Sequence, residues 1–311
     1  MRQPHTAYFD QRAWIDLANQ SGTDSLLEKF VAKAEEGVVI VPLSHGNIVE
    51  TVRTPNQKRR ARIAEIMISL SRGTTIVPQW ALVSPELKRA ISRLFDLPTP
   101  ASPVAFGKGV DLAFGGPRLE QLRIRFGSDA VDALSAFLST EEGMSALLTG
   151  PFDTVYQAMS QDFLDGAAQH TALAEAARAS IKTRSPIFRK RMYAAALAST
   201  LDDEIRSVAS ELGFSYDQLL ALGQKGLMRL FSDVPCLHVE IELGSLRHSF
   251  WDRALQPNDM VDLATLASAI PYCDAVLTER FWADLARRAK LDIQYSTLIS
   301  ADLEEIYDSI A

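Results

Sequence analysis

The chain of 311 residues predicts an α/β fold in which a parallel sheet is interrupted by a large, mainly helical insertion. Three observations support this prediction. Strand-like and helix-like segments alternate at both ends of the chain, which is typical of α/β layers. The middle contains long segments rich in Ala and Leu with helical periodicity. Because neither end alone supplies a full sheet, we expect residues 1–80 and 250–311 to fold together around an insertion of residues 81–249.

The first eighty residues supply half of the expected sheet. The run GVVIVPLS is β-branched, as in strands buried on both faces of a parallel sheet. The helix before it is expected to stop at Gly37. In order, the predicted elements are a strand at 7–9, helices at 11–20 and 25–36, a strand at 37–44, helices at 47–52 and 59–71, and a strand at 74–77.

The middle of the chain and its C-terminal end predict different structures. The stretch 97–118 is rich in Pro and Gly and is expected to be a loop or linker. The alternation of helices and strands returns after Pro257. The remaining predicted elements are helices at 129–139, 162–181 and 189–212, then a helix at 259–270, a strand at 275–278, a helix at 280–290, a strand near 292–295 and a helix from about 300.

The composition argues against several classes of protein. Cys236 and Cys273 are far apart and have no CxxC partner, so neither a disulfide framework nor a zinc knuckle is indicated. The N-terminus lacks the apolar core of a signal peptide, and no segment approaches the roughly 20 apolar residues that span a bilayer. We therefore expect a soluble, cytoplasmic protein with no membrane partner.

The chain has a formal net charge of -7, which argues against nonspecific coating of nucleic acid. Local charge differs from the total in two stretches. QKRRAR (57–62) and KTRSPIFRKR (182–191) are basic clusters that contain no acid. Each cluster is either a binding surface for an anion or simply the solvated face of a helix.

Four carboxylates from distant parts of the chain fall near the ends of predicted strands. Asp10 follows the strand AYF, Glu50 lies two turns into the helix after VVIVPLS, Asp262 lies at the start of the helix before AVLT, and Glu279 directly follows AVLT. In an open parallel sheet, ligands collect outside the carboxyl ends of the strands. We therefore expect these four side chains to converge on one rim.

Each acid also has a purely structural interpretation. Asp10 is suited to N-cap the following helix. Asp262 and Asp259 have the spacing of a capping box. Glu50 is explained equally well as a residue on an exposed helix face, and Asp274, before the strand AVLT, as a turn residue.

Three segments resemble parts of the PIN-domain nuclease family. In NDMVDLATLASAIPYCDAVLTERFW, as in the closing part of that family, an Asp opens a helix and a Thr-plus-acid sequence ends the next strand. AYFDQRAWIDLA resembles the first strand of the family, which ends in Asp, and the Glu of SHGNIVET resembles its second acid. The family usually has Asp where this chain has Glu279, and the helical block has no counterpart.

The resemblance implies a three-layer α/β/α core of the PIN type and a metal-dependent nuclease. It makes Asp10, Glu50, Asp262 and Glu279 the catalytic metal ligands, with Asp274 sharing or replacing the fourth role. Carboxylates about 4 Å apart repel each other by roughly 4 kcal/mol at an effective dielectric constant of about 20, so such a cluster requires a cation or protons. Oxygen-only ligands favour Mg²⁺ or Mn²⁺, and the histidines form no HxxxH or HxH pattern that would favour zinc.

Nucleic acid is the expected partner, because such ions stabilise the hydrolysis of phosphodiester bonds. RNA is favoured over DNA only by the resemblance, since PIN-like bacterial proteins are mostly ribonucleases. Contacts with nucleic acid are expected from basic residues of the two clusters and beside Glu279, namely Lys58, Arg59, Arg189, Lys190, Arg191 and Arg280.

Two other classes of function stay open. One is a non-catalytic PIN-like scaffold whose helical block binds a protein partner or a second copy of the chain. The other is a phosphohydrolase of the haloacid dehalogenase type, because FDQRAW places an Asp after a strand and LDDEIR offers a later pair of acids. That type requires DxD at the first site, and Arg12 occupies the place of the second acid.

Overall fold

The computed structural model describes residues 4–20, 22, 25–115, 123–124, 127–150, 168–169 and 171–310. The chain forms two compact units. The first contains Met1–Pro78, Ala105–Asp165 and Tyr272–Ala311, and the second contains Gln79–Val104 and Gly166–Pro271. This division differs from the expected one in two places: residues 105–165 belong to the unit with the sheet, and residues 250–271 belong to the helical unit.

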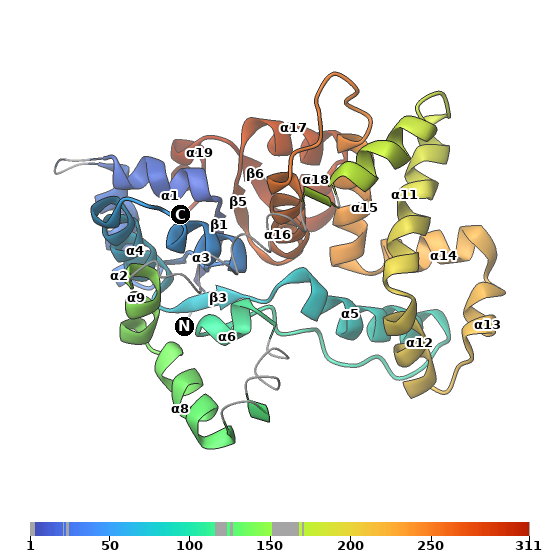
Figure 1. Ribbon diagram of the computed structural model, residues 1–311, viewed down its shortest axis with the longest axis horizontal. Coiled ribbons are helices and arrows are strands. Elements are labelled where there is room, and N and C mark those ends of the chain that lie inside the picture. Colours follow the sequence, from blue (N-terminus) through green and yellow to red (C-terminus); the bar gives the residue numbers. More distant parts are fainter. Residues whose placement is uncertain are drawn as a thin grey trace. The chain divides into compact units, whose positions relative to one another are not determined.

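The first unit contains a four-stranded parallel sheet, which confirms the mixed α/β class and the parallel strands. The strand order is β2 (Val39–Ile40), β1 (His5–Phe9), β5 (Ala275–Leu277) and β6 (Leu298–Ser300). Figure 1 shows β5 between β1 and β6. Strands from the two ends of the chain are therefore direct neighbours, and Phe9 pairs with Leu277 at the carboxyl end of both.

Two other strand predictions have different outcomes. The predicted strand at 74–77 is present as β3 (Thr74–Ile76). It forms an isolated parallel bridge between Thr75 and Leu43 and an antiparallel pair with β4 (Phe106–Lys108), which lies in the expected loop. Residues 292–295 belong to a short helix, α18 (Leu291–Tyr295), and the strand follows at 298–300. The alternation of Ile293 and Tyr295 resembles a strand, but Ile293 is 73% exposed and so contributes nothing to a buried sheet.

Aromatic packing against the sheet fixes the N-terminal helices of the first unit. The ring of Phe9 lies 5.4 Å from that of Trp14 and 5.3 Å from that of Phe30. Trp14 also donates its indole N–H to the carbonyl of Phe9 at 3.2 Å. The helices of this unit are α1 (Gln11–Ala18), α2 (Leu26–Glu35), α3 (His45–Val52), α4 (Gln57–Ser71), α6 (Val110–Ala113), α8 (Ser128–Leu138), α9 (Glu141–Thr149), α17 (Arg280–Arg288), α18 and α19 (Leu303–Ser309).

All regular elements in the described part of the second unit are helices. Its helices are α5 (Gln79–Leu94), α11 (Pro186–Thr200), α12 (Asp202–Glu211), α13 (Tyr216–Leu220), α14 (Gly223–Ser232), α15 (Pro235–Arg247) and α16 (Asn258–Tyr272), whose last residue belongs to the first unit. The predicted helix at 189–212 is two helices that meet at Leu201. Of the predicted helix at 162–181, residues 162–167 and 170 lie outside the described residues, and 171–180 are helical.

Buried charge is neutralised locally in the second unit. Asp259 accepts from Arg247 at 2.9 Å and from Arg253 at 2.7 and 2.8 Å. Burial raises the pKa of Asp259, but hydrogen bonds from Arg253, the N–H of Gln256 and Arg247 outweigh burial and leave this pKa below its ordinary value.

None of the helices in the described ranges has both the length and the hydropathy needed to cross a bilayer.

A candidate acidic site at the sheet edge

Asp10 lies directly after β1 and combines a structural role with exposure to the sheet edge. Its N–H donates to the carbonyl of Leu277 at 3.0 Å, so its backbone extends the pairing with β5. Its side chain accepts from the N–H of Ala13 at 3.0 Å and so caps α1. The carboxylate also accepts a hydrogen bond from the N–H of Glu279. The N-cap interpretation is therefore correct, and the same carboxylate faces the end of the neighbouring strand.

Glu279 occupies the N-cap position of α17 but does not cap it. Its side chain makes no capping hydrogen bond, and it is exposed. The preceding residue, Thr278, is buried and donates its N–H to the carbonyl of Ser300 of β6 at 2.9 Å. The backbone at this point is held by both neighbouring strands, while the Glu279 carboxylate is left available to a ligand.

Glu50 reaches the same edge because α3 is fixed to the end of β1. The helix begins with a capping box between Ser44 and Asn47. The Asn47 amide also donates to the carbonyl of Phe9 at 3.2 Å, within a buried environment. One turn further along α3, Thr51 accepts from Gln11 at 3.0 Å. These contacts position Glu50, on the last turn of α3.

Ser44 and Asn47 are positioning residues that the search for acids overlooked. The spacing S-x-x-N at 44–47 is a helix-start signature and so is visible in the sequence. The contact with Phe9 is not visible there, because it joins residues 38 positions apart.

The three carboxylates share one electrostatic environment. Burial is the main cause that raises the pKa of Asp10 to about 6, and the charge of Glu279 raises this pKa further. The N–H of Ala13, the charge of Arg12 and the N–H of Glu279 act in the opposite direction and lower it. Burial likewise raises the pKa of Glu50 to about 6, with further increases from Asp10 and Glu279 and a decrease from Arg53. Both groups therefore resist ionisation more than ordinary carboxylates do.

A pocket of about 410 Å³ opens in front of Asp10 and Glu279. Its lining includes Arg280, a predicted nucleic-acid contact, and two exposed residues that were not predicted to belong to the site, Arg12 and Asp16. Arg12 and Asp16 lie 3.6 Å apart as a surface ion pair on α1. The pocket thus combines acids at the strand ends with arginines at its rim.

Asp274 does not lie at this edge. It precedes β5, and its side chain accepts from the N–H of Thr6 at 2.8 Å, at the amino end of β1. The expectation that Asp274 shares the role of Glu279 as a metal ligand is therefore wrong, because the three residues of β5 separate it from the carboxyl ends of the strands. Its role is the structural one, a polar contact at the start of the strand.

Asp262 lies on α16 and belongs to the second unit. Its neighbour Asp259, with which it has capping-box spacing, is buried between Arg247 and Arg253. Asp10, Glu50 and Glu279, by contrast, all belong to the first unit. The role of Asp262 as a metal ligand therefore remains a prediction.

The predicted nucleic-acid contacts are divided between the two units. Lys58 and Arg59 are exposed on the first turn of α4. Their neighbour Arg60 is instead buried and donates to the carbonyls of Thr54 at 2.9 Å and Gly150 at 2.7 Å, so part of this basic cluster is structural.

The other predicted contacts, Arg189, Lys190 and Arg191, lie on α11 in the second unit. Arg189 lies 5.5 Å from the ring of Trp251, and Lys190 pairs with Glu242.

The acids fit a hard divalent cation chemically but do not form a ready coordination shell. Within the described ranges, no three His, Cys, Asp or Glu side chains are grouped closely enough to hold a metal ion. Asp10, Glu50 and Glu279 nevertheless offer only oxygen donors, which Mg²⁺ and Mn²⁺ prefer. The raised pKa of Asp10 and Glu50 shows that nearby arginines do not neutralise them fully, so a bound cation would relieve a real electrostatic cost.

Comparisons with protein-family models, with curated proteins and with solved structures gave no match to this chain. The resemblance to the PIN-domain family therefore remains a prediction.

Proposed function

We propose that this chain is a metal-dependent nuclease, and most specifically a ribonuclease, whose site is the acidic pocket at the carboxyl ends of β1 and β5. The observation that carries the proposal is that acids from separate elements act on one another's surroundings: the charge of Glu279 contributes to raising the pKa of Asp10, and the charges of Asp10 and Glu279 contribute to raising the pKa of Glu50. A buried carboxylate whose pKa is raised costs stability when it is ionised, and such groups are concentrated at functional sites. We include Asp262 as the fourth ligand on the resemblance alone.

We also propose that the first unit is a three-layer core of the PIN type. One face of the sheet carries Phe9 and Leu277, which lie in the same buried cluster as residues of α1, α2, α4 and α19. The other face carries Val276 and Ile299, which are also buried, and α17 packs against β6. Burial on both faces is typical of a parallel sheet between two helical layers.

In this proposal the chain's own groups have distinct roles. Two backbone N–H groups hold the Asp10 carboxylate in one orientation, whereas Glu279 is exposed and free to adjust. Arg12 and Arg280 lie in the pocket lining, where a guanidinium is suited to hold a phosphate oxygen. Mg²⁺ or Mn²⁺ bound by the acids would supply a water of lowered pKa and stabilise charge on the phosphate.

The pocket favours this function over the phosphohydrolase alternative. In that type a second acid two residues after the first is required, and here Arg12 stands at that place and pairs with Asp16 on the surface. The non-catalytic scaffold remains the competing hypothesis, and it differs in one measurable respect, since it predicts no metal-dependent cleavage.

The test is cleavage of labelled single-stranded RNA with Mn²⁺ or Mg²⁺, with and without EDTA, by the wild-type protein and Asp10→Asn. Asn is as good an N-cap as Asp, so this substitution keeps the cap of α1 and removes only the charge. We expect a loss of at least about 100-fold, because even changing a partner of a metal ligand typically costs about 10- to 100-fold.

Asp284→Asn is the matched control, since Asp284 is a surface carboxylate of the first unit that pairs with Arg288 on α17 and lies outside the pocket lining. It should cleave RNA at close to the wild-type rate. Glu279→Gln and Asp262→Asn then decide which further acids belong to the site. Cleavage that survives Asp10→Asn, or that persists in EDTA, would refute the proposal, and absence of cleavage by the wild type would favour the scaffold.

A further inference from the structure

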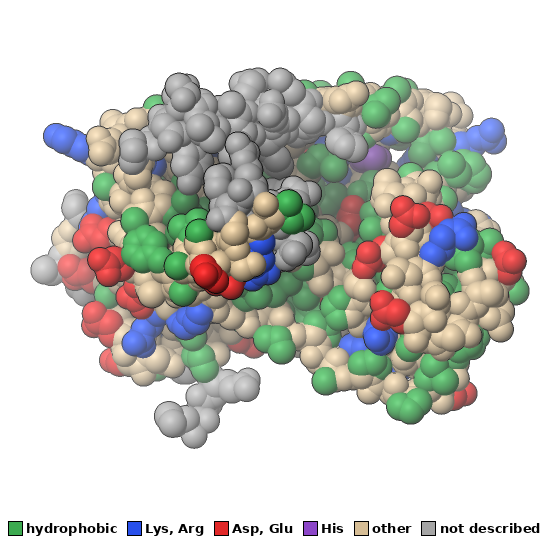
Figure 2. Space-filling view, turned by 60° about the horizontal axis from the view of Figure 1, so that its bottom comes forward, with side chains coloured by type: hydrophobic (Ala, Val, Ile, Leu, Met, Phe, Trp, Pro, Cys, Tyr) green, Lys and Arg blue, Asp and Glu red, His purple; other side chains and the backbone are tan. Residues whose placement is uncertain are grey.

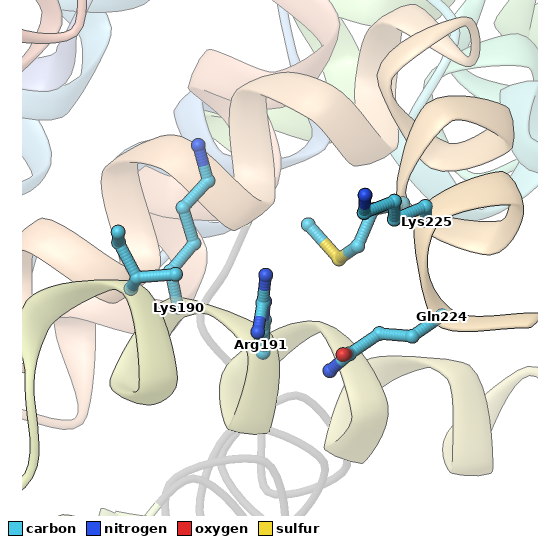
Figure 3. A pocket seen from close by; sticks show the side chains of 6 residues that line it. Lys190, Arg191, Gln224 and Lys225 are labelled. Atoms are coloured by element: carbon cyan, nitrogen blue, oxygen red, sulfur yellow. The ribbon is translucent and has the colours of Figure 1, made fainter.

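The second unit contains a pocket of about 340 Å³ between α11 and α14. Its lining includes Ile187, Arg191, Lys225 and Met228. Figure 3 shows Arg191 extending from α11 into this space, with Gln224 and Lys225 on the side of α14. The volume is within the range of small-ligand pockets.

Both helices that form the pocket are cationic and lack acids. Neither α11, PIFRKRMYAAALAST, nor α14, GQKGLMRLFS, contains Asp or Glu, although the chain has 39 of them. On the face drawn in Figure 2, by contrast, the acidic and basic side chains of the described residues are interspersed. Two facing helices with one sign of charge create a local positive potential on an acidic protein.

The cations of α11 do not all contribute equally to this potential. Arg189 lies against Trp251 and donates to the carbonyl of Arg184 at 2.6 Å, so its head group is engaged. Lys190 pairs with Glu242 on α15. Arg191 and Lys225 are exposed, and neither has an ion-pair partner among the described residues. These two cations remain available to an external anion.

The pocket also offers an apolar surface beside these cations. Ile187 of α11 is 66% exposed, which is high for a residue of this type, and Met228 of α14 also lines the pocket. None of the described lining residues is acidic. The pocket therefore suits a ligand that joins an anion to a flat or apolar body.

We propose that this pocket holds one nucleotide of a single-stranded RNA, with a phosphate between Arg191 and Lys225 and the base against Ile187 and Met228. The proposal rests on the proposed nuclease function. The acidic site repels the polyanion that it is proposed to cleave, so affinity for RNA has to come from cationic surfaces elsewhere on the chain. Gln224, at the pocket edge, carries both a donor and an acceptor for the edge of a base.

The test measures binding of a fluorescent oligouridine to the full chain in EDTA, where no metal-dependent cleavage occurs. We expect Arg191→Gln with Lys225→Gln to weaken binding at least about tenfold at low salt. The same double variant should flatten the salt dependence by about 0.7 for each phosphate that it no longer neutralises. Lys88→Gln with Arg206→Gln removes two exposed cations from the same unit and should have a much smaller effect.

A second comparison tests the apolar surface. Met228→Ser should weaken binding of oligouridine but leave binding of an abasic strand of equal charge unchanged, because only the base contacts the thioether. Equal losses in the Arg191/Lys225 and Lys88/Arg206 double variants would overturn the proposal. Tighter binding of a labelled acidic peptide containing leucine and phenylalanine than of oligouridine would also overturn the proposal.

The outcomes also separate this inference from the nuclease proposal. Asp10→Asn should bind oligouridine in EDTA at least as tightly as the wild type, since it removes a carboxylate that repels the strand and leaves the pocket in the second unit intact. Pocket-dependent binding without any metal-dependent cleavage would refute the nuclease and leave the RNA pocket intact. Metal-dependent cleavage without pocket-dependent binding would refute the RNA pocket and leave the nuclease proposal intact.

Discussion

Asp259 in the helical unit and Asp10 at the sheet edge are both sheltered carboxylates, yet their surroundings act in opposite directions. Asp259 is 2% exposed and lies between two arginines, so its pKa falls below the ordinary value. Asp10 lies beside Glu279 and near Glu50, and its pKa rises to about 6. The negative charge of Asp259 is compensated by the two arginines, whereas the negative charge of Asp10 is not compensated.

This difference separates structural acids from candidate functional ones. A lowered pKa means that the charged form stabilises the fold, whereas a raised pKa means that the fold holds the charged form at a cost. Strongly perturbed carboxylates are concentrated at functional sites, which is why we propose a ligand for these acids. The predictions below test this contrast.

The largest expected effect is on stability in the second unit. Asp259→Ala leaves Arg247 buried without its partner, and breaking a buried pair in this way typically costs about 3 to 5 kcal/mol in the free energy of unfolding. Asp252→Ala is the matched control, because Asp252 is an exposed acid next to Arg253. Denaturant unfolding measures both. Equal effects of the two substitutions would mean that Asp259 is not the structural acid described here.

Binding of Mn²⁺ should give the next largest effect. At a concentration of about 100 times Kd, a ligand that binds only the folded state stabilises it by about 2.7 kcal/mol. We expect a corresponding rise in melting temperature at about pH 7.5, where Asp10 and Glu50 are ionised, and little rise at about pH 5, where protons compete. An unchanged melting temperature at both pH values contradicts metal binding by the acids.

A smaller effect is expected when one uncompensated charge is removed without metal. Because the pKa of Asp10 is raised, the folded state binds this proton more tightly than the unfolded state, and stability falls as pH rises from about 4 to about 6. Asp10→Asn should therefore be more stable than the wild type by roughly 1 to 2 kcal/mol above about pH 7, after discounting for partial exposure.

The advantage of Asp10→Asn should vanish near pH 4, where the wild-type carboxyl is also neutral. A variant that is less stable than the wild type at every pH would identify Asp10 as a purely structural residue.

The smallest effect concerns Glu50. The charge of Asp10 contributes to raising its pKa, so Asp10→Asn should lower the pKa of Glu50 below about 6. Titration of the Glu50 carboxyl carbon by NMR measures this shift. A pKa that does not move would show that the two carboxylates are too far apart to serve one ligand.

Much of the fold could be predicted from the sequence because strands and helices of α/β proteins have distinct periodicities. Strand 7–9 and the helices over 11–20 and 280–290 lie close to their predicted positions. The pairing of β3 with Phe106–Lys108 could not be predicted, because a three-residue strand in a segment rich in Gly and Pro carries little signal of its own.

The site could be predicted only where it follows from strand direction. Asp10 and Glu279 each follow a strand, so a parallel sheet places both at one edge. Asp274 precedes β5, and Glu279 follows it after Thr278. Because β5 has only three residues, spacing alone did not show that the two carboxylates lie at opposite ends of the strand. The contact from Asn47 that brings Glu50 toward Asp10 depends on tertiary packing, which no local pattern encodes.

Calorimetric titration of Mn²⁺ into the wild-type protein, Asp10→Asn and Asp284→Asn at about pH 7.5 tests the central claim most directly. If Asp10, Glu50 and Glu279 hold a divalent cation, the wild type and Asp284→Asn bind Mn²⁺ with similar affinity, and Asp10→Asn binds it far more weakly. Equal binding by all three proteins, or no binding by the wild type, would contradict the account.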